Sequence, residues 1–144
     1  MSTTPKRQQQ LREAIELLFF SYRAFTQGPD AILEKRGLSR VHHRILYFVG
    51  SNPGQSVNDL LAVLAISKQA LNAPLRQLIS MELIKNNKSK SDRRVRELHL
   101  TSEGKRLEAR LTGTQLLQLE NVFSQQGKKA ENAWRDVMQQ LAED

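Results

Sequence analysis

Apolar residues recur in steps of three and four near the start of the chain and predict a long amphipathic helix. Thr4 and Pro5 supply a helix cap followed by proline at the first helical position. The pattern predicts that this helix ends at Gly28-Pro29, and that residues 30–36 form a separate short helical piece closed by Gly37. The apolar stripe consists of Leu11, Ile15, Leu18, Tyr22 and Phe25, with Ala14, Phe19 and Phe20 beside it.

A second helix is predicted from Arg40 to about Val49, with Ser39 as its cap. It carries the adjacent pair His42 and His43. Neighbouring positions on a helix diverge by about 100°, so the two imidazoles do not share one metal ion as an i, i+4 pair does. We therefore expect no metal site here.

Two short helices joined by a tight turn are predicted next. Ser56 to Asp59 has capping-box spacing and opens the first of them, and a break follows at Ala65-Ile66. Ser67 caps the second helix, with Ala70, Leu71, Leu75, Leu78 and Ile79 predicted on its core side. Its outward positions are Lys68, Gln69, Asn72 and Arg76. Side chains of these types contact base edges and phosphates, so the helix pair indicates a helix-turn-helix.

A β-hairpin with a basic tip is predicted after the helix pair. Apolar residues at Leu83-Ile84 and the alternation Leu98-His99-Leu100 mark two strands with one buried face. Residues 85–96 hold one acid, Asp92, and a net charge of +5 out of +7 for the whole chain. We expect a flexible loop that suits a phosphate backbone, because each cation releases condensed counterions. The six cations are Lys85, Lys88, Lys90, Arg93, Arg94 and Arg96.

Amphipathic helices are predicted at both ends of the chain. One begins at Ser102 after the cap Thr101 and stops at Gln126-Gly127, and the last runs from Lys128 to Leu141. Together with the first helix they present more apolar surface than a small domain between them can cover, so we expect a homodimer. The predicted interface residues are Leu11, Ile15, Leu18, Trp134, Val137, Met138 and Leu141.

Composition narrows the class of protein. At 144 residues with 39% hydrophobic and 26% charged residues, the chain is expected to be globular. No apolar run approaches the roughly 20 residues of a membrane span, so no membrane partner is expected. The chain has no cysteine, and its start lacks a hydrophobic signal segment, which predicts a cytoplasmic protein. Without a Gly-rich phosphate loop or paired carboxylates, neither an enzyme nor a cofactor is expected.

The order of these elements, a helix, a turn, a polar-faced helix and a basic hairpin, is that of a winged helix. The run from Asp92 through Arg94, Leu98, Leu100-Thr101 and Gly104 resembles the wing signature of the MarR family of bacterial transcriptional regulators, D-x-R followed by L-T-x-x-G. The resemblance covers nearly the whole chain. It implies that Asp92 and Arg94 lie in the wing, with the arginine reaching the minor groove, and that homodimers bind pseudo-palindromic operators on double-stranded DNA.

The resemblance also implies a small aromatic or lipophilic effector that releases DNA. Such a molecule would bind where the dimerisation helices meet the winged helix. We expect this pocket to be lined by Phe19, Tyr22, His42, His43, Arg44 and Tyr47. The alternative that these residues only pack helix against helix stays open.

Two residues depart from the family pattern. Pro74 lies inside the predicted recognition helix, which predicts a kink or a helix in two pieces. Glu82 stands where the family usually has glycine, so a left-handed conformation there would cost roughly 1 kcal/mol or more.

The expected fold is mostly α with a small β-hairpin, a winged helix-turn-helix with N- and C-terminal dimerisation helices. Residues 1–38 form the N-terminal dimerisation helix and linker, 39–101 the DNA-binding domain, and 102–144 the C-terminal dimerisation helices. The DNA-binding residues are expected to be Ser67, Lys68, Gln69, Asn72, Arg76, Lys88, Lys90, Asp92, Arg93, Arg94 and Arg96. Two alternatives remain: a winged helix that binds RNA or another protein through its wing, and a catalytic or metal-binding helical protein.

Overall fold

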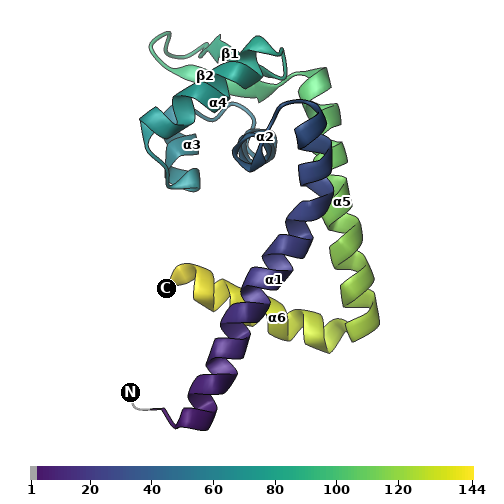
Figure 1. Ribbon diagram of the computed structural model, residues 1–144. Coiled ribbons are helices and arrows are strands. Elements are labelled where there is room, and N and C mark those ends of the chain that lie inside the picture. The colour runs from purple at the N-terminus through teal and green to yellow at the C-terminus, as the bar shows by residue number, and fades with distance from the viewer. Residues whose placement is uncertain (1–2) are drawn as a thin grey trace.

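The computed structural model describes residues 3–144 and is mostly helical, with a two-stranded antiparallel wing (Figure 1). This confirms the predicted fold class. The winged helix lies at one end, and the long helices extend away from it. The elements are α1 (Pro5–Lys35), α2 (Arg40–Ser51), α3 (Val57–Leu64), α4 (Lys68–Ser80), β1 (Ile84–Lys88), β2 (Arg96–Leu100), α5 (Ser102–Gln126) and α6 (Lys128–Glu143).

Helix α1 begins at the predicted cap, where Thr4 Oγ1 accepts a hydrogen bond from the Arg7 N–H at 3.1 Å. It does not end at Gly28-Pro29 but continues to Lys35, so the predicted stop and the separate piece over residues 30–36 were wrong. Pro29 has no N–H to donate to the Phe25 carbonyl. Gln115 of α5 replaces it, because its Nε2 donates to that oxygen at 3.3 Å.

Close packing against α5 explains why α1 has a glycine at position 28. A Cβ atom at this position would lie 2.9 Å from Oγ1 of Thr114, so α1 and α5 approach closely here. The glycine-proline pair therefore belongs to a helix crossing rather than to a helix end.

The buried core lies in the winged helix and in the ends of α1 and α5 that contact it. Of the residues predicted on the core side of α4, Leu71, Leu75 and Leu78 are buried in it, whereas Ala70 is exposed and its predicted core position was wrong. Ile79 of α4 is half-buried, as are Val57, Leu61 and Leu64 of α3. The buried apolar residues are Leu33, Leu38, Ile45, Leu46, Val49, Leu60, Leu71, Leu75, Leu78, Leu83, Ile84, Leu98, Leu107 and Leu111.

The helix-turn-helix is defined by its caps. Ser56 and Asp59 form the predicted capping box, and the Ser67 hydroxyl accepts from the Ala70 N–H at 3.0 Å. Between the two helices Ala65 takes a left-handed conformation, with φ of 54°, which makes the turn tight. Helix α4 runs from Lys68 to Ser80 without interruption through Pro74, so it is one helix rather than two pieces, and the predicted kink at Pro74 stays a prediction.

The junction between the wing and α5 explains why threonine stands at position 101 and glycine at position 104. Glu82 has φ of 61°, so it takes the left-handed conformation whose cost was considered from the sequence. The Thr101 hydroxyl donates to the Glu82 carbonyl at 2.7 Å and accepts from the Gly104 N–H at 2.9 Å. A Cβ atom at Gly104 would lie only 2.0 Å from the Leu83 carbonyl oxygen. Threonine caps α5 while glycine lets α5 lie directly against the wing.

Candidate nucleic-acid interface and ligand cleft

The outer face of α4 carries the predicted polar residues. Burial of Leu71, Leu75 and Leu78 fixes the rotation of this helix, and the opposite positions therefore face solvent. Lys68, Gln69, Asn72 and Arg76 are exposed, as is Ser67 at the cap. All four helical residues belong to the single helix α4.

The tip of the wing forms a hydrogen-bonded turn around Ser89. Ser89 is only 6% exposed, and its N–H donates to the Val95 carbonyl at 2.8 Å. Its hydroxyl oxygen accepts from the Ser91 and Asp92 N–H groups at 3.2 and 3.4 Å. Lys88, Lys90 and Arg93 project from this turn as exposed side chains. Ser89 carries no charge and was not among the predicted site residues.

Asp92 orients Arg94. Its Oδ1 accepts from the Arg94 backbone N–H at 3.0 Å and from Arg94 Nε at 3.4 Å. The arginine side chain is nevertheless 92% exposed. A carboxylate that holds Nε limits the rotamers of the guanidinium while leaving it accessible to an external acceptor.

A cleft of about 450 Å³ separates α4 from the wing. Its polar walls come from Lys68, Asn72 and Arg76 on α4, from Asn86, Arg94 and Arg96 in the wing, and from Ser56 and Asn58 at the start of α3. Its apolar lining is Val57, Leu75, Ile79 and Val95. No acidic side chain is among the described residues that line it. Ser56, Asn58 and Asn86 were not predicted, because no local pattern distinguishes them from other surface polar residues.

A second cleft, of about 330 Å³, lies between α1, α2 and α5. Of the six predicted pocket residues, it is lined by Tyr22, His43, Arg44 and Tyr47. Phe19 is not among the lining residues and is 61% exposed on α1. The lining residues that sequence reasoning missed are Phe25, Thr26, Pro29, Asp30, Arg40, Phe48, Thr112, Gln115, Leu116 and Leu119.

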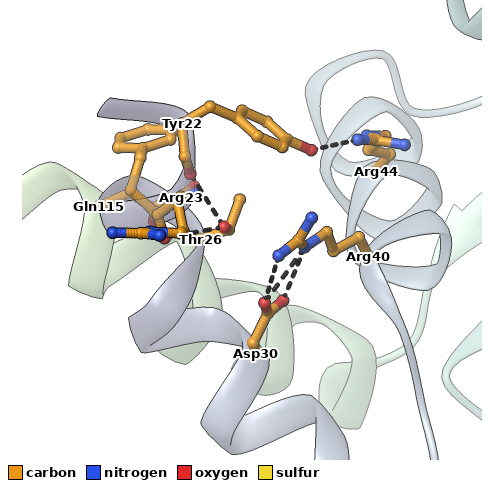
Figure 2. Close-up of polar contacts among 8 residues, drawn as sticks. Tyr22, Arg23, Thr26, Asp30, Arg40, Arg44 and Gln115 are labelled. Carbon is orange, nitrogen blue, oxygen red and sulfur yellow. Dashed lines mark hydrogen bonds and ion pairs between the residues drawn. The ribbon is translucent and has the colours of Figure 1, made fainter. Parts of the chain in front are cut away.

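Two arginines cross this cleft from α2 to α1, as Figure 2 shows. Arg40 is paired with Asp30: its Nη2 lies 2.8 Å from Oδ2, and its Nε donates to both carboxylate oxygens at 3.1 and 3.2 Å. The hydrogen bond with Asp30 raises the pKa of Arg40 above its usual value. Arg44 instead donates to the hydroxyl group of Tyr22, a neutral partner. The charge of Arg44 is therefore the less compensated of the two.

The two histidines have different environments. His43 lines the cleft, where its Nε2 lies 3.2 Å from Thr112 Oγ1, and burial lowers its pKa below the usual value. His42 does not line it. Its Nδ1 accepts from the Ser39 N–H at 3.0 Å, so a neutral ring carries its proton on Nε2, which faces Gln77 Oε1 at 2.8 Å. His42 thus joins the start of α2 to α4.

The predicted dimerisation residues lie on surfaces that this chain leaves open. Ile15 and Val137 are 65% and 64% exposed, and α6 has no buried residue. Met138 is half-buried, whereas Leu11, Leu18, Trp134 and Leu141 are exposed. Further apolar side chains on these helices are also exposed, among them Leu17, Phe20, Leu116, Leu117 and Val122.

Within residues 3–144, no group of three or more metal-binding side chains lies close enough to hold an ion. Over the same residues, no helix combines the length and apolar character that crossing a membrane requires.

Comparison with known proteins agrees with this geometry. Residues 36–95 match the model of the MarR family. The chain is 38% identical over 133 residues to the HTH-type transcriptional regulator PetP of Rhodobacter capsulatus, a match that covers 92% of this chain and 80% of PetP.

Two solved structures share the fold. One is FabT of Streptococcus pneumoniae in complex with DNA, with a TM-score of 0.81 at 16% identity over 92% of this chain and 95% of that one. The other is a MepR variant of S. aureus bound to an oligodeoxyribonucleotide, with a TM-score of 0.63 at 20% identity over 90% and 96% of the two chains.

Proposed function

The chain belongs to the MarR family of winged-helix transcriptional regulators, which are not enzymes, and we propose that it represses transcription as a homodimer on a pseudo-palindromic operator. The observation that carries the proposal is that the polar face of α4 and the basic wing form the walls of one cleft, and none of the described residues that line this cleft is acidic. FabT and the MepR variant are bound to DNA in their structures, which supports duplex DNA as the partner of this chain.

In the proposed complex α4 enters the major groove and the wing enters the adjacent minor groove. Gln69 and Asn72 have side chains that pair bidentately with adenine, and Arg76 with guanine or a phosphate. Arg94, held at Nε by Asp92, reaches into the minor groove, where negative potential attracts guanidinium groups. Lys88, Lys90, Arg93 and Arg96 neutralise backbone phosphates.

The exposed apolar faces of α1 and α6 support the proposed homodimer. A protein of this size rarely leaves so many contiguous apolar side chains in water unless another surface covers them. A second copy of the chain is the natural partner, because a two-fold axis would place two α4 helices on half-sites about one helical turn apart.

We further propose that an aromatic or lipophilic carboxylate binds in the cleft between α1, α2 and α5. Arg44 offers a cation whose partner in the cleft is a neutral hydroxyl, and Tyr22, Phe25 and Tyr47 supply aromatic walls. The ligand would release DNA by binding more tightly to a dimer whose α4 helices are wrongly spaced. A tenfold loss of DNA affinity needs about 1.4 kcal/mol of such coupling.

The test of DNA recognition starts by selecting bound duplexes from a random pool. Affinity for the selected duplex should exceed that for scrambled DNA and for RNA of the same sequence. Its logarithm should fall with log salt by about 0.9 for each phosphate neutralised. Arg94→Ala should weaken binding to every duplex, whereas Gln69→Ala should relax base preference by about 1–3 kcal/mol at one position. Equal affinity for RNA, or no preferred duplex, would favour the alternative of a general anion-binding wing.

Repression and its release need two further measurements. A reporter gene behind the selected duplex should be silenced by the protein, and activation instead would reject the repressor role. Aromatic carboxylates should be screened for thermal stabilisation of the free protein and then added to the DNA complex. A compound that stabilises the protein but leaves DNA affinity unchanged would identify a pocket without a switch.

A further inference from the structure

We propose that the cleft between α4 and the wing holds one sugar-phosphate backbone of the operator, and that Asn86 positions a guanidinium group on a phosphate of that strand. The inference rests on the proposed function, because it assumes that α4 and the wing enter adjacent grooves. It assigns a role to a residue that sequence reasoning did not identify.

The geometry of a duplex leaves little choice for what occupies this cleft. The major groove and the neighbouring minor groove are separated by a single sugar-phosphate strand. If α4 lies in one groove and the wing in the next, that strand must pass between them. The cleft of about 450 Å³ is the space between these two elements. A bound backbone would therefore be enclosed on both sides rather than touched from one.

The chemistry of the lining fits such a strand. Lys68, Arg76, Arg94 and Arg96 surround it with four positive charges, and no acidic side chain is among the described residues of the lining. Phosphate oxygens favour this environment. Leu75, Ile79 and Val95 contribute apolar surface of the kind that packs against deoxyribose. A free inorganic anion would use the cations but not the apolar surface.

Asn86 lines the cleft and has a side-chain oxygen that lacks a hydrogen-bond partner. It follows Ile84 at alternate positions on β1, so it shares the face of the strand that turns toward the core. Its Oδ1 is buried and has no hydrogen-bond partner. Buried acceptors are nearly always paired in native proteins. A donor has to approach it, and every charged group lining the cleft is a donor.

Arg96 is placed to supply that donor. Its Nη1 lies 3.4 Å from the backbone oxygen of Asn86, at the limit of a hydrogen bond. A guanidinium group has five N–H donors, so it can bind the Asn86 side chain and a phosphate at the same time. Asn86 would then act as a positioning residue, which holds Arg96 against the strand without carrying charge itself.

The test combines one substitution with neutralisation of single phosphates. Asn86→Ala removes the side-chain acceptor, and Asn87→Ala is the matched control, because Asn87 is the next residue of β1 and is exposed. Both proteins are compared with wild type on the selected operator and on duplexes with one neutral methylphosphonate at each backbone position in turn. Thermal melting of both variants establishes that they are folded.

For wild type and Asn87→Ala, a methylphosphonate at one linkage per half-site should lower the affinity about tenfold or more. This linkage should lie between the α4 contacts and the wing contacts. Asn86→Ala should bind the unmodified operator about tenfold more weakly than wild type does. A methylphosphonate at that linkage should then lower the affinity of Asn86→Ala only slightly further. A merely structural role for Asn86 would lower affinity equally at all linkages and would overturn the proposal.

Three other outcomes also decide between these possibilities. If the operator is bound selectively but Asn86→Ala behaves as Asn87→Ala does, the inference fails while the proposed function stands. If no duplex is preferred by any of the proteins, the proposed function fails and the inference with it. Displacement of DNA by millimolar inorganic phosphate from wild type but not from Asn86→Ala would identify a free-anion site and overturn the backbone assignment.

Discussion

The contact between α5 and the wing predicts a large cost for the smallest possible substitution, Gly104→Ala. The new Cβ atom would lie 2.0 Å from the Leu83 carbonyl oxygen, and contacts of Cβ atoms below 3.0 Å are essentially never found. The two backbones would have to separate by about 1 Å or more. Neither is free to do so, because the Thr101 N–H donates to that same oxygen at 3.1 Å.

The expected magnitude follows from the two contacts at risk. Overpacking a tight backbone contact costs about 1–3 kcal/mol. Loss of the cap from the Thr101 hydroxyl to the Gly104 N–H, now 2.9 Å long, costs about 1 kcal/mol more. Gly104→Ala should therefore lower the free energy of unfolding by about 2–4 kcal/mol. At about 3–4 °C per kcal/mol for a chain of this size, Tm should fall by about 6–16 °C.

Gly113→Ala is the matched control, because it makes the same chemical change in the same helix. A Cβ atom at Gly113 would meet nothing within 4 Å. Alanine inside a helix is more favourable than glycine by about 0.5–1 kcal/mol, so this variant should melt slightly higher than wild type. Thermal melting and urea unfolding at one protein concentration would measure both. Equal shifts for the two variants, or a Gly104→Ala protein as stable as wild type, would refute the steric argument.

Four further predictions use other features of the structure. Truncation after Gly127 removes α6 and should convert the dimer to a monomer in sedimentation; a dimer of undiminished stability would contradict the proposed interface. Asp92→Ala should weaken operator binding with little change in Tm, since it frees the wing arginine without touching the core. Gln115→Leu should cost about 1 kcal/mol in urea unfolding, because the Phe25 carbonyl loses its replacement donor. Burial lowers the pKa of His43, so its contribution to stability should be complete above the unfolded pKa of about 6.5 and decline as pH falls toward the lower folded pKa, a slope that His43→Asn should reduce.

The candidate site could be predicted where its residues belong to a regular element. Positions such as Gln69 and Asn72 were identified because the buried leucines of α4 set the rotation of the helix, and three- and four-residue spacing records that rotation in the sequence. The cleft between α1, α2 and α5 was located only in part, since its walls come from three helices. Asp30 and Arg40 face each other across this cleft ten residues apart, and no periodicity marks such a pair.

The sequence by itself determined the helices of the winged helix, their serine and threonine caps, and the hairpin with its basic tip, because each depends on residues within a few positions of one another. Tertiary structure alone decided how helix α1 continues past residues that locally favour a helix end. Helix α1 passes through Gly28 and Pro29 because Thr114 and Gln115, far along the chain, provide a closely fitting surface and a replacement hydrogen-bond donor. Local rules treat glycine and proline as helix ends because they count only the hydrogen bonds that a helix can make with itself, and a neighbouring helix can supply the one that is missing.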